Sequence, residues 1–207
     1  MVFKYIIFFL VCVITPIFPS DDTLYSSTGR PLAPSIDYFL NAKKNRGKCA
    51  LLVTSDRGRK NTGVWAKNTL EEHGYEVLAL EVIPNEEDQV NAFLKRWISN
   101  QVDVIFTLGG TGFSKRDTTV DVVEKWILKP MPGFGELFRR LTHEDWKNLR
   151  EEIPDMSLLT RTSAGMHGDC FLFALPGSLD AVKLGFEIIL PTLPHLLGQR
   201  TKDHKEP

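Results

Sequence analysis

The feature that most restricts the fold is a regular alternation of two hydrophobic patterns that begins at Gly47. Compact apolar runs, typical of strands buried on both faces, are followed by segments in which apolar residues recur at helical spacing. The runs predicted as strands span 49–54, 75–83, 102–108 and 169–175. The segments predicted as helices span 61–73, 86–100, 118–128 and 178–190. This order predicts an α/β fold of three layers, in which a mostly parallel sheet carries helices on both faces.

Sheets of this kind place their ligands beyond the carboxyl ends of the strands. The rule points to the segments that follow Thr54, Ile83, Leu108 and Leu175.

Local patterns add detail to the helices. In the first helix, Val64, Trp65 and Leu70 are expected on the buried side, and Gly74 is placed to end it. The highly charged stretch 143–155 is interpreted as an inserted surface helix.

The chain of 207 residues is long enough for one domain with extensions. We expect this domain over 47–200, a linker over 21–46 and a polar tail over 201–207. Residues 1–20 combine a charged start, a short apolar run and a polar exit, which is the pattern of a signal peptide. Three interpretations remain open for that segment: a secretory signal, a membrane tether, or a start codon assigned upstream of the true domain.

The charge and the cysteines limit the possible partners and the compartment. A net charge of −1 does not predict a nucleic-acid partner. The basic run within 43–48 is typical of a solvated linker, with a patch for nucleic acid or anionic lipid as the alternative. The three cysteines form neither a disulfide framework nor a zinc-site spacing. Cys49 and Cys170 lie in apolar runs and are expected to be buried, which fits a reducing compartment.

The sharpest local motif is the turn formed by Gly109, Gly110, Thr111 and Gly112, between a predicted strand and a helix. Glycines let the backbone turn tightly and bring consecutive N–H groups close to a ligand, where they can cradle phosphate oxygens. The turn has neither the spacing of the dinucleotide fingerprint nor the Gly-Lys-Ser/Thr of a P-loop. From these residues alone, a phosphate site and a plain tight connection remain equally open.

Asp117 follows this turn, beside the cations Lys115 and Arg116. A carboxylate next to bound phosphate is repulsive unless a cation lies between them, which suggests Mg²⁺ bridging Asp117 and the phosphates, although a helix cap is the commoner use of Asp at such a place. The alternative is that Asp117 caps the following helix. Arg161 also has two interpretations, a phosphate ligand or a surface ion pair.

Several strings, in order along the domain, resemble the MogA/MoaB molybdopterin-binding family, which includes the gephyrin G domain. The longest is Leu-Gly-Gly-Thr-Gly-Phe-Ser-Lys-Arg-Asp at 108–117. The others are Thr-Ser-Asp-Arg at 54–57, Met-Pro-Gly-Phe-Gly-Glu at 131–136, Leu-Thr-Arg-Thr-Ser-Ala-Gly at 159–165, Leu-Pro-Gly-Ser at 175–178 and Ile-Ile-Leu-Pro-Thr-Leu-Pro-His at 188–195. Several ordered motifs over one domain are more specific than any one of them.

The resemblance implies the molybdopterin-binding fold, a reaction and a set of roles. Family members transfer AMP from Mg-ATP to the terminal phosphate of molybdopterin and release pyrophosphate. The implied cofactor is therefore Mg²⁺, and the implied substrates are ATP and molybdopterin. Backbone N–H groups of 109–112 would hold phosphate, Asp117 would hold the metal, and Arg116 or Lys115 would offset developing charge. Asp56, Gly177 and Ser178 are further implied binding residues.

One position departs from the family pattern. Family adenylyltransferases carry an Ile-Pro-Asp string after the second strand, where this chain has Asn85. Asn is neutral and can approach a metal only through its carbonyl oxygen. The acidic residues Glu86, Glu87 and Asp88 that follow could supply the missing charge. We keep Asn85 in the predicted catalytic set together with Glu86. The departure leaves one alternative open, a non-catalytic molybdopterin-binding or scaffold module on the same fold.

The resemblance also implies a homotrimer, or a hexamer built from trimers, and a partner protein that inserts molybdenum. ATP and molybdopterin are intracellular, so the expected location is the cytoplasm. A secretory or membrane-tethered protein is the alternative, and membrane contact is expected only if residues 1–20 are retained.

Overall fold

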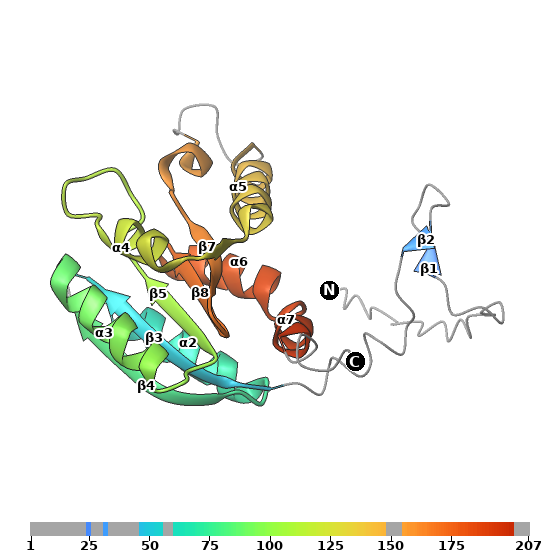
Figure 1. Ribbon diagram of the computed structural model, residues 1–207. Coiled ribbons are helices and arrows are strands. Elements are labelled where there is room, and N and C mark those ends of the chain that lie inside the picture. Colours follow the sequence, from blue (N-terminus) through green and yellow to red (C-terminus); the bar gives the residue numbers. More distant parts are fainter. Residues whose placement is uncertain (1–23, 26–30, 33–45, 56–59, 148–154, 201–207) are drawn as a thin grey trace, which may run out of the picture. The chain divides into compact units, whose positions relative to one another are not determined.

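The computed structural model describes residues 24–25, 31–32, 46–55, 60–147 and 155–200 (Figure 1). The chain divides into two compact units, Met1–Asn41 and Ala42–Pro207. In the first unit, β1 (Leu24–Tyr25) pairs with β2 (Pro31–Leu32) in antiparallel orientation. These short strands lie inside the predicted linker, whereas the predicted segments 1–20 and 201–207 lie outside the described residues.

The second unit contains a six-stranded sheet in the order β4-β3-β5-β8-β7-β6. Four strands are parallel: β3 (Lys48–Thr54), β4 (Glu76–Ile83), β5 (Val104–Leu108) and β8 (Cys170–Leu175). At the other edge, β7 (Ser163–His167) is antiparallel to β8, and β6 (Lys129–Pro130) is antiparallel to β7. The prediction of a mostly parallel sheet is confirmed, and the antiparallel edge is an addition to it.

Alternate side chains of the central strands enter two separate hydrophobic cores. Residues such as Leu51, Phe106 and Phe173 face one core, where Phe106 stacks on Phe173 with ring centroids 5.4 Å apart. Their neighbours, such as Leu52 and Ile105, face the other core. This alternation follows from the two-residue period of a strand and requires apolar cover on both faces.

Helices cover both faces of the sheet, so this unit has three layers, with the sheet in the middle (Figure 1). The first core is closed by α2 (Lys60–Glu72), α5 (Pro132–Lys147), α6 (Leu179–Ile189) and α7 (Leu193–Gln199). The second core is closed by α3 (Glu87–Ser99) and α4 (Thr119–Trp126). The predicted placement of helices on both faces is therefore confirmed.

The end of α2 shows how the local sequence sets an element boundary. Gly74 has a φ of +81° and donates its N–H to the carbonyl of Glu71, while Tyr75 donates to the carbonyl of Leu70. These two bonds form the Schellman arrangement that glycine favours, as predicted. The predicted burial of Leu70 is confirmed, and Trp65 is partly buried against the core. The prediction for Val64 is wrong, because this side chain is 47% exposed.

The interpretation of 143–155 as an inserted surface helix is wrong at the two ends of the segment that the structure describes, because each end belongs to another helix. His143 belongs to α5, whose first half packs Phe134 and Phe138 into the core. Asp155 is instead the N-cap of the short helix η1 (Met156–Leu159), and residues 148–154 lie outside the described part. Hydrogen bonds from Ser157, and then one from His143, hold the pKa of the Asp155 carboxyl below its usual range.

Cys49 and Cys170 are buried free thiols, as predicted. Among the residues with described structure, no helix has the length and apolar character needed to cross a bilayer.

Candidate functional site

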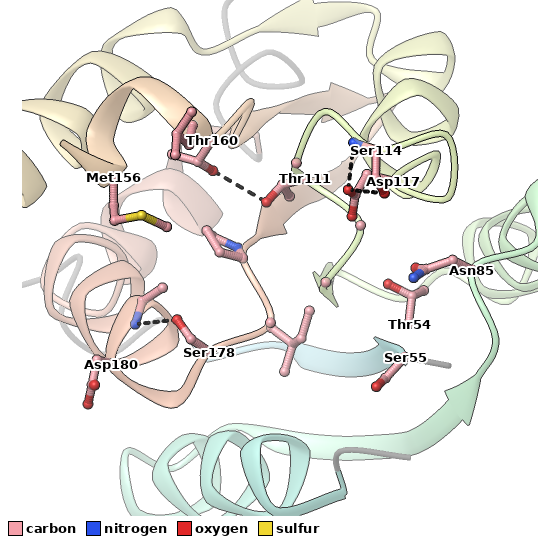
Figure 2. Close-up of a pocket in the computed structure, with 18 of the residues that line it drawn as sticks. Thr54, Ser55, Asn85, Thr111, Ser114, Asp117, Met156, Thr160, Ser178 and Asp180 are labelled. Carbon is pink, nitrogen blue, oxygen red and sulfur yellow. Dashed lines mark hydrogen bonds between the residues drawn. The ribbon is translucent and has the colours of Figure 1, made fainter. Parts of the chain in front are cut away.

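A cavity of about 530 Å³ lies at the carboxyl ends of the parallel strands (Figure 2). Ser55 follows β3, Asn85 follows β4, Gly109 follows β5 and Gly177 follows β8, and all four line the cavity. These are the four segments that the topology rule predicts. The volume falls within the range of about 300–1,000 Å³ that is typical of small-molecule sites.

The turn after β5 requires glycine at its first two positions. Gly109 has a φ of +122°, and a β-carbon there would lie 2.2 Å from the carbonyl oxygen of Thr54. Gly110 has a φ of +64°, and a β-carbon there would lie 2.3 Å from the hydroxyl oxygen of Thr119. Both positions combine a backbone conformation that side chains disfavour with a close approach of neighbouring atoms. The glycines therefore let β5 turn sharply against the end of β3.

The backbone N–H groups of this turn are not equivalent. Gly109 donates its N–H to the carbonyl of Leu175 at 2.8 Å, which extends the ladder between β5 and β8. The prediction that all four residues of 109–112 offer their N–H groups to phosphate is thus wrong for Gly109. In the part of the chain that the structure describes, the N–H groups of Gly110, Thr111 and Gly112 donate to no other group.

The carbonyls of Gly110, Thr111 and Gly112 each accept a hydrogen bond from a residue that does not line the cavity. Gly110 accepts from the N–H of Val120 at 3.2 Å, and Thr111 accepts from the N–H of Arg161 at 2.9 Å. Gly112 accepts from Nε of Arg161 at 2.9 Å. In a planar trans peptide the N–H of the next residue points away from the carbonyl. The N–H groups of Thr111 and Gly112 consequently point away from those partners, which makes the turn an electropositive concavity.

Asp117 lines the cavity beside this turn. Its Oδ2 accepts from the N–H of Ser114 at 3.0 Å and from Ser114 Oγ at 2.6 Å, and it lies 2.7 Å from where a β-carbon on Gly112 would be. Among the described residues, Oδ1 of Asp117 has no hydrogen-bond donor. Thr118, not Asp117, occupies the N-cap position of α4, which removes the capping alternative. One carboxylate oxygen therefore stays available to a cation or a ligand.

Asn85 and Glu86 were predicted to serve where the family has a second acidic residue, and of these two only Asn85 lines the cavity. Asn85 Oδ1 lies 3.2 Å from the hydroxyl of Thr119, and a β-carbon on Gly110 would come within 2.9 Å of it. Glu86 is exposed at the N-cap of α3 and is not among the residues that line the cavity. Asn85 and Asp117 thus flank the glycine turn, while the role of Glu86 stays a prediction.

The remaining predicted residues divide in the same way. Arg116, Gly177 and Ser178 line the cavity, and Ser178 accepts the N–H of Ala181 at 3.4 Å as the N-cap of α6. The positive end of the α6 dipole therefore faces the same space as the glycine turn. Asp56 lies outside the described residues, so its predicted role is not tested.

The far wall of the cavity was not predicted from the sequence. Figure 2 shows Met156 and Asp180 across the cavity from Asp117 and Asn85. The wall comes from α5, η1 and α6, and its members are Phe138, Thr142, Asp145, Met156, Leu159, Thr160, Asp180, Ala181 and Leu184. These segments carry no shared motif. The signals available were Leu159 and Thr160, which begin the matched string at 159–165, and Asp180, which lies two residues after the matched string that ends at Ser178.

The geometry agrees with a comparison of the chain with known proteins. A family model described as "Probable molybdopterin binding domain" matches residues 50–195. The chain belongs to this family. The match covers the sheet from Ala50 in β3 to the end of β8 and includes the glycine turn. The resemblance to the MogA/MoaB family that the motifs indicate is thereby confirmed.

Similar proteins support the membership in the molybdopterin-binding domain family. Molybdenum cofactor biosynthesis protein B of Staphylococcus carnosus is 36% identical over 170 residues, which covers 79% of this chain and 96% of that protein. The solved structure of the tungsten cofactor synthesizing protein MoaB from Pyrococcus furiosus is 30% identical, with a TM-score of 0.66 over 76% of this chain and 98% of that one. The MoaB structure from Thermus thermophilus is also 30% identical, with a TM-score of 0.62 over 75% and 97% of the two chains. The chain is therefore a molybdenum cofactor biosynthesis protein of the MoaB/MogA type.

Proposed function

We propose that this chain is a molybdopterin adenylyltransferase that transfers AMP from Mg-ATP to the terminal phosphate of molybdopterin. An oxygen of the molybdopterin phosphate attacks the α-phosphorus of ATP, a new P–O bond forms, and the bond to the β-phosphate breaks to release pyrophosphate. The observation that carries the proposal is the turn at 110–112. Its N–H groups have no acceptor among the described residues, and it lies beside the half-satisfied carboxylate of Asp117.

The residues of the cavity suit a reaction between two anions. The N–H groups of Gly110, Thr111 and Gly112 are fixed donors that bind phosphate oxygens without reorganising. The N-terminus of α6 adds its dipole from the opposite side of the turn. Arg116 places a cation at the cavity edge. Holding both substrates in line supplies about 7–11 kcal/mol of the barrier reduction in favourable cases.

The donor set also fits a magnesium ion that arrives with ATP. Mg²⁺ is held in many phosphoryl-transfer sites by one or two carboxylates together with substrate phosphates and water. Asp117 offers one carboxylate oxygen, and Asn85 offers a carbonyl oxygen on the other side of the turn. The described residues contain no group of three or more His, Cys, Asp or Glu arranged to hold a metal alone. When bound with ATP, the ion would neutralise phosphate charge.

The experiment is isothermal titration of the purified full-length chain with molybdopterin, followed by Mg-ATP and a continuous pyrophosphate assay. We expect molybdopterin binding and pyrophosphate release. Asp117→Asn should lower the rate by about 10²–10³-fold, the loss typical of removing one preorganised electrostatic group. Asp169→Asn is the matched control, because Asp169 is exposed at the opposite end of β8 and should leave the rate unchanged.

A second function rests on Asn85. The family's adenylyltransferases have Asp where this chain has Asn85. A neutral amide at this position would bind a metal ion less strongly and so weaken the neutralisation of phosphate charge. The alternative is therefore a module that binds molybdopterin without transferring AMP. Molybdopterin binding without pyrophosphate release, together with a large gain of activity in Asn85→Asp, would establish it.

The proposal extends to the surroundings of the reaction. The adenylylated product would pass to a partner protein that inserts molybdenum, and the chain would act as a homotrimer or a hexamer of trimers in the cytoplasm.

A further inference from the structure

We propose that Arg161 is a positioning residue that holds the loop 110–117 in its anion-binding form. It precedes β7 and is far from this loop in sequence, yet it donates hydrogen bonds to three carbonyl groups of the loop. The inference deepens the proposed function, because it assigns a residue that sets the site's affinity for phosphate. It concerns pyrophosphate binding directly, so it can be tested apart from AMP transfer.

The guanidinium of Arg161 uses each of its three nitrogens on a different acceptor. Nε donates to the carbonyl of Gly112 at 2.9 Å, and Nη2 donates to the carbonyl of Asp117 at 2.5 Å. Nη1 donates to Oδ1 of Asp121 at 2.5 Å, in the first turn of α4. The backbone N–H of Arg161 adds a bond to the carbonyl of Thr111 at 2.9 Å. One residue thus fastens the loop at both ends and anchors it to the next helix.

These contacts select between the two interpretations of Arg161 that the sequence leaves open. The ion pair with Asp121 exists, at 29% and 42% side-chain exposure, but it is one part of a larger clamp. The phosphate-ligand interpretation is not supported, because the guanidinium points its donors at the loop's carbonyls and not into the cavity. Arg161 acts on a phosphate through the loop.

The clamp fixes the direction of the loop's donors. A peptide carbonyl that binds Arg161 turns the following N–H to the opposite side. The bonds at Thr111 and Gly112 therefore orient the N–H groups of Gly112 and Phe113, and the bond at Asp117 holds the backbone that carries the proposed metal ligand. The guanidinium also lies 5.5 Å from the ring centroid of Phe113, which is 70% exposed, and this distance is within the range of a cation–π contact.

Lysine cannot replace this arrangement. Three acceptors are spread around one planar fork, whereas a lysine ammonium is a single point at the end of a flexible chain. Arg161→Lys keeps the positive charge and removes the fork. It therefore separates a role in positioning from a role in general charge attraction.

The test uses the full-length chain labelled with [¹⁵N]glycine and titrated with inorganic pyrophosphate. In the wild type, the amide signals of Gly110 and Gly112 should shift on titration. In Arg161→Lys, the Gly112 signal should differ before any ligand is added, and pyrophosphate should bind about 10- to 100-fold more weakly, the factor for one lost hydrogen bond to a charged group. Signals of remote glycines such as Gly74 and Gly168 should stay in place.

The matched control is Arg139→Lys. Arg139 is also half-buried and donates to a backbone carbonyl, that of Thr162 at 3.4 Å, but among the described residues it makes no hydrogen bond to the loop 110–117. This variant should bind pyrophosphate like the wild type at a similar Tm. If Arg161→Lys does not fold, Asp121→Asn decides, because it removes only the anchor on α4 and should still move the Gly112 signal and weaken binding.

Unchanged pyrophosphate affinity in the folded variant would overturn the inference, as would a wild type in which Gly110 and Gly112 do not respond to pyrophosphate. A wild type that binds pyrophosphate at these glycines but transfers no AMP would refute the proposed enzyme and leave the role of Arg161 standing.

Discussion

Replacing Gly109 by alanine should destabilise the protein more than its single added methyl group suggests. At a φ of +122°, a non-glycine residue carries backbone strain of about 1–3 kcal/mol. The added β-carbon would also lie 2.2 Å from the carbonyl oxygen of Thr54, which is backbone in a buried strand and cannot move aside cheaply. Overpacking of this kind costs a further amount of about 1–3 kcal/mol. We therefore expect a loss of about 2–6 kcal/mol, a large share of the roughly 5–15 kcal/mol that stabilises a typical domain.

The assay is equilibrium urea unfolding followed by circular dichroism, with thermal unfolding as a second probe. For a domain of this size, each kcal/mol corresponds to a change in Tm of about 2–4 °C. Gly133→Ala is the control, because no atom lies within 4 Å of a β-carbon there and Gly133 sits in α5, where alanine is the better helix former. A Gly109→Ala variant that unfolds at the same urea concentration as the control would refute the geometry given for the turn.

Two further predictions follow from the titratable groups. Burial raises the pKa of Cys170 to about 12 and also raises the pKa of Cys49. In a Cys12→Ser variant, neither thiol should therefore react with a disulfide reagent at pH 8 until urea is added. Rapid labelling of the native protein would contradict this prediction. The pKa of Asp155 is lower in the folded protein than its ordinary value of 3.8, so its contribution to stability is present above that pH and is lost as the pH falls through the folded value. The difference in urea midpoint between the wild type and Asp155→Asn should therefore shrink below about pH 4, and a difference that grows there would show that the sign is wrong.

The main elements of the fold could be predicted because their signals are local. The central strands are short continuous runs of apolar residues that are buried on both faces, and Gly74 marks the end of α2 by itself. The helix α5 escaped prediction because Pro132, Gly133 and Gly135 in its first turn are typical of loops. Proline is nevertheless tolerated at the first position of a helix. The core contacts of Phe134 then stabilise what the local propensity disfavours.

The antiparallel strand β7, which lies between β8 and the edge strand β6, had even less local signal. Its sequence, Ser-Ala-Gly-Met-His, contains no β-branched residue, and the strand is held by its pairing with β8. Gly165 in this strand lies where a β-carbon would come within 2.6 Å of the carbonyl oxygen of Lys129, so close packing at the edge requires glycine. Such a requirement depends on tertiary structure and cannot be deduced from the sequence of the strand.

The candidate site also contains some features that a local string predicts and others that depend on tertiary contacts. The glycine turn, Asp117 and Ser178 could be found because each belongs to a short contiguous string. The sequence could not show that the Gly109 N–H is bonded within the sheet, because its acceptor, the carbonyl of Leu175, is 66 residues away along the chain. The same holds for Arg161, whose bonds to Gly112 and Asp121 span 49 and 40 residues. Sequence strings locate the ligand-facing residues, and long-range packing decides which of their groups are available.

The most direct test of the central claim is mass spectrometry of the small molecules in a reaction of the full-length chain with molybdopterin and Mg-ATP. If the cavity carries out adenylyl transfer, molybdopterin bearing one AMP should appear in step with pyrophosphate, and neither should form with Asp117→Asn. If molybdopterin is recovered unchanged from a wild-type protein that binds it, the chain is a binding module and the proposed reaction is wrong.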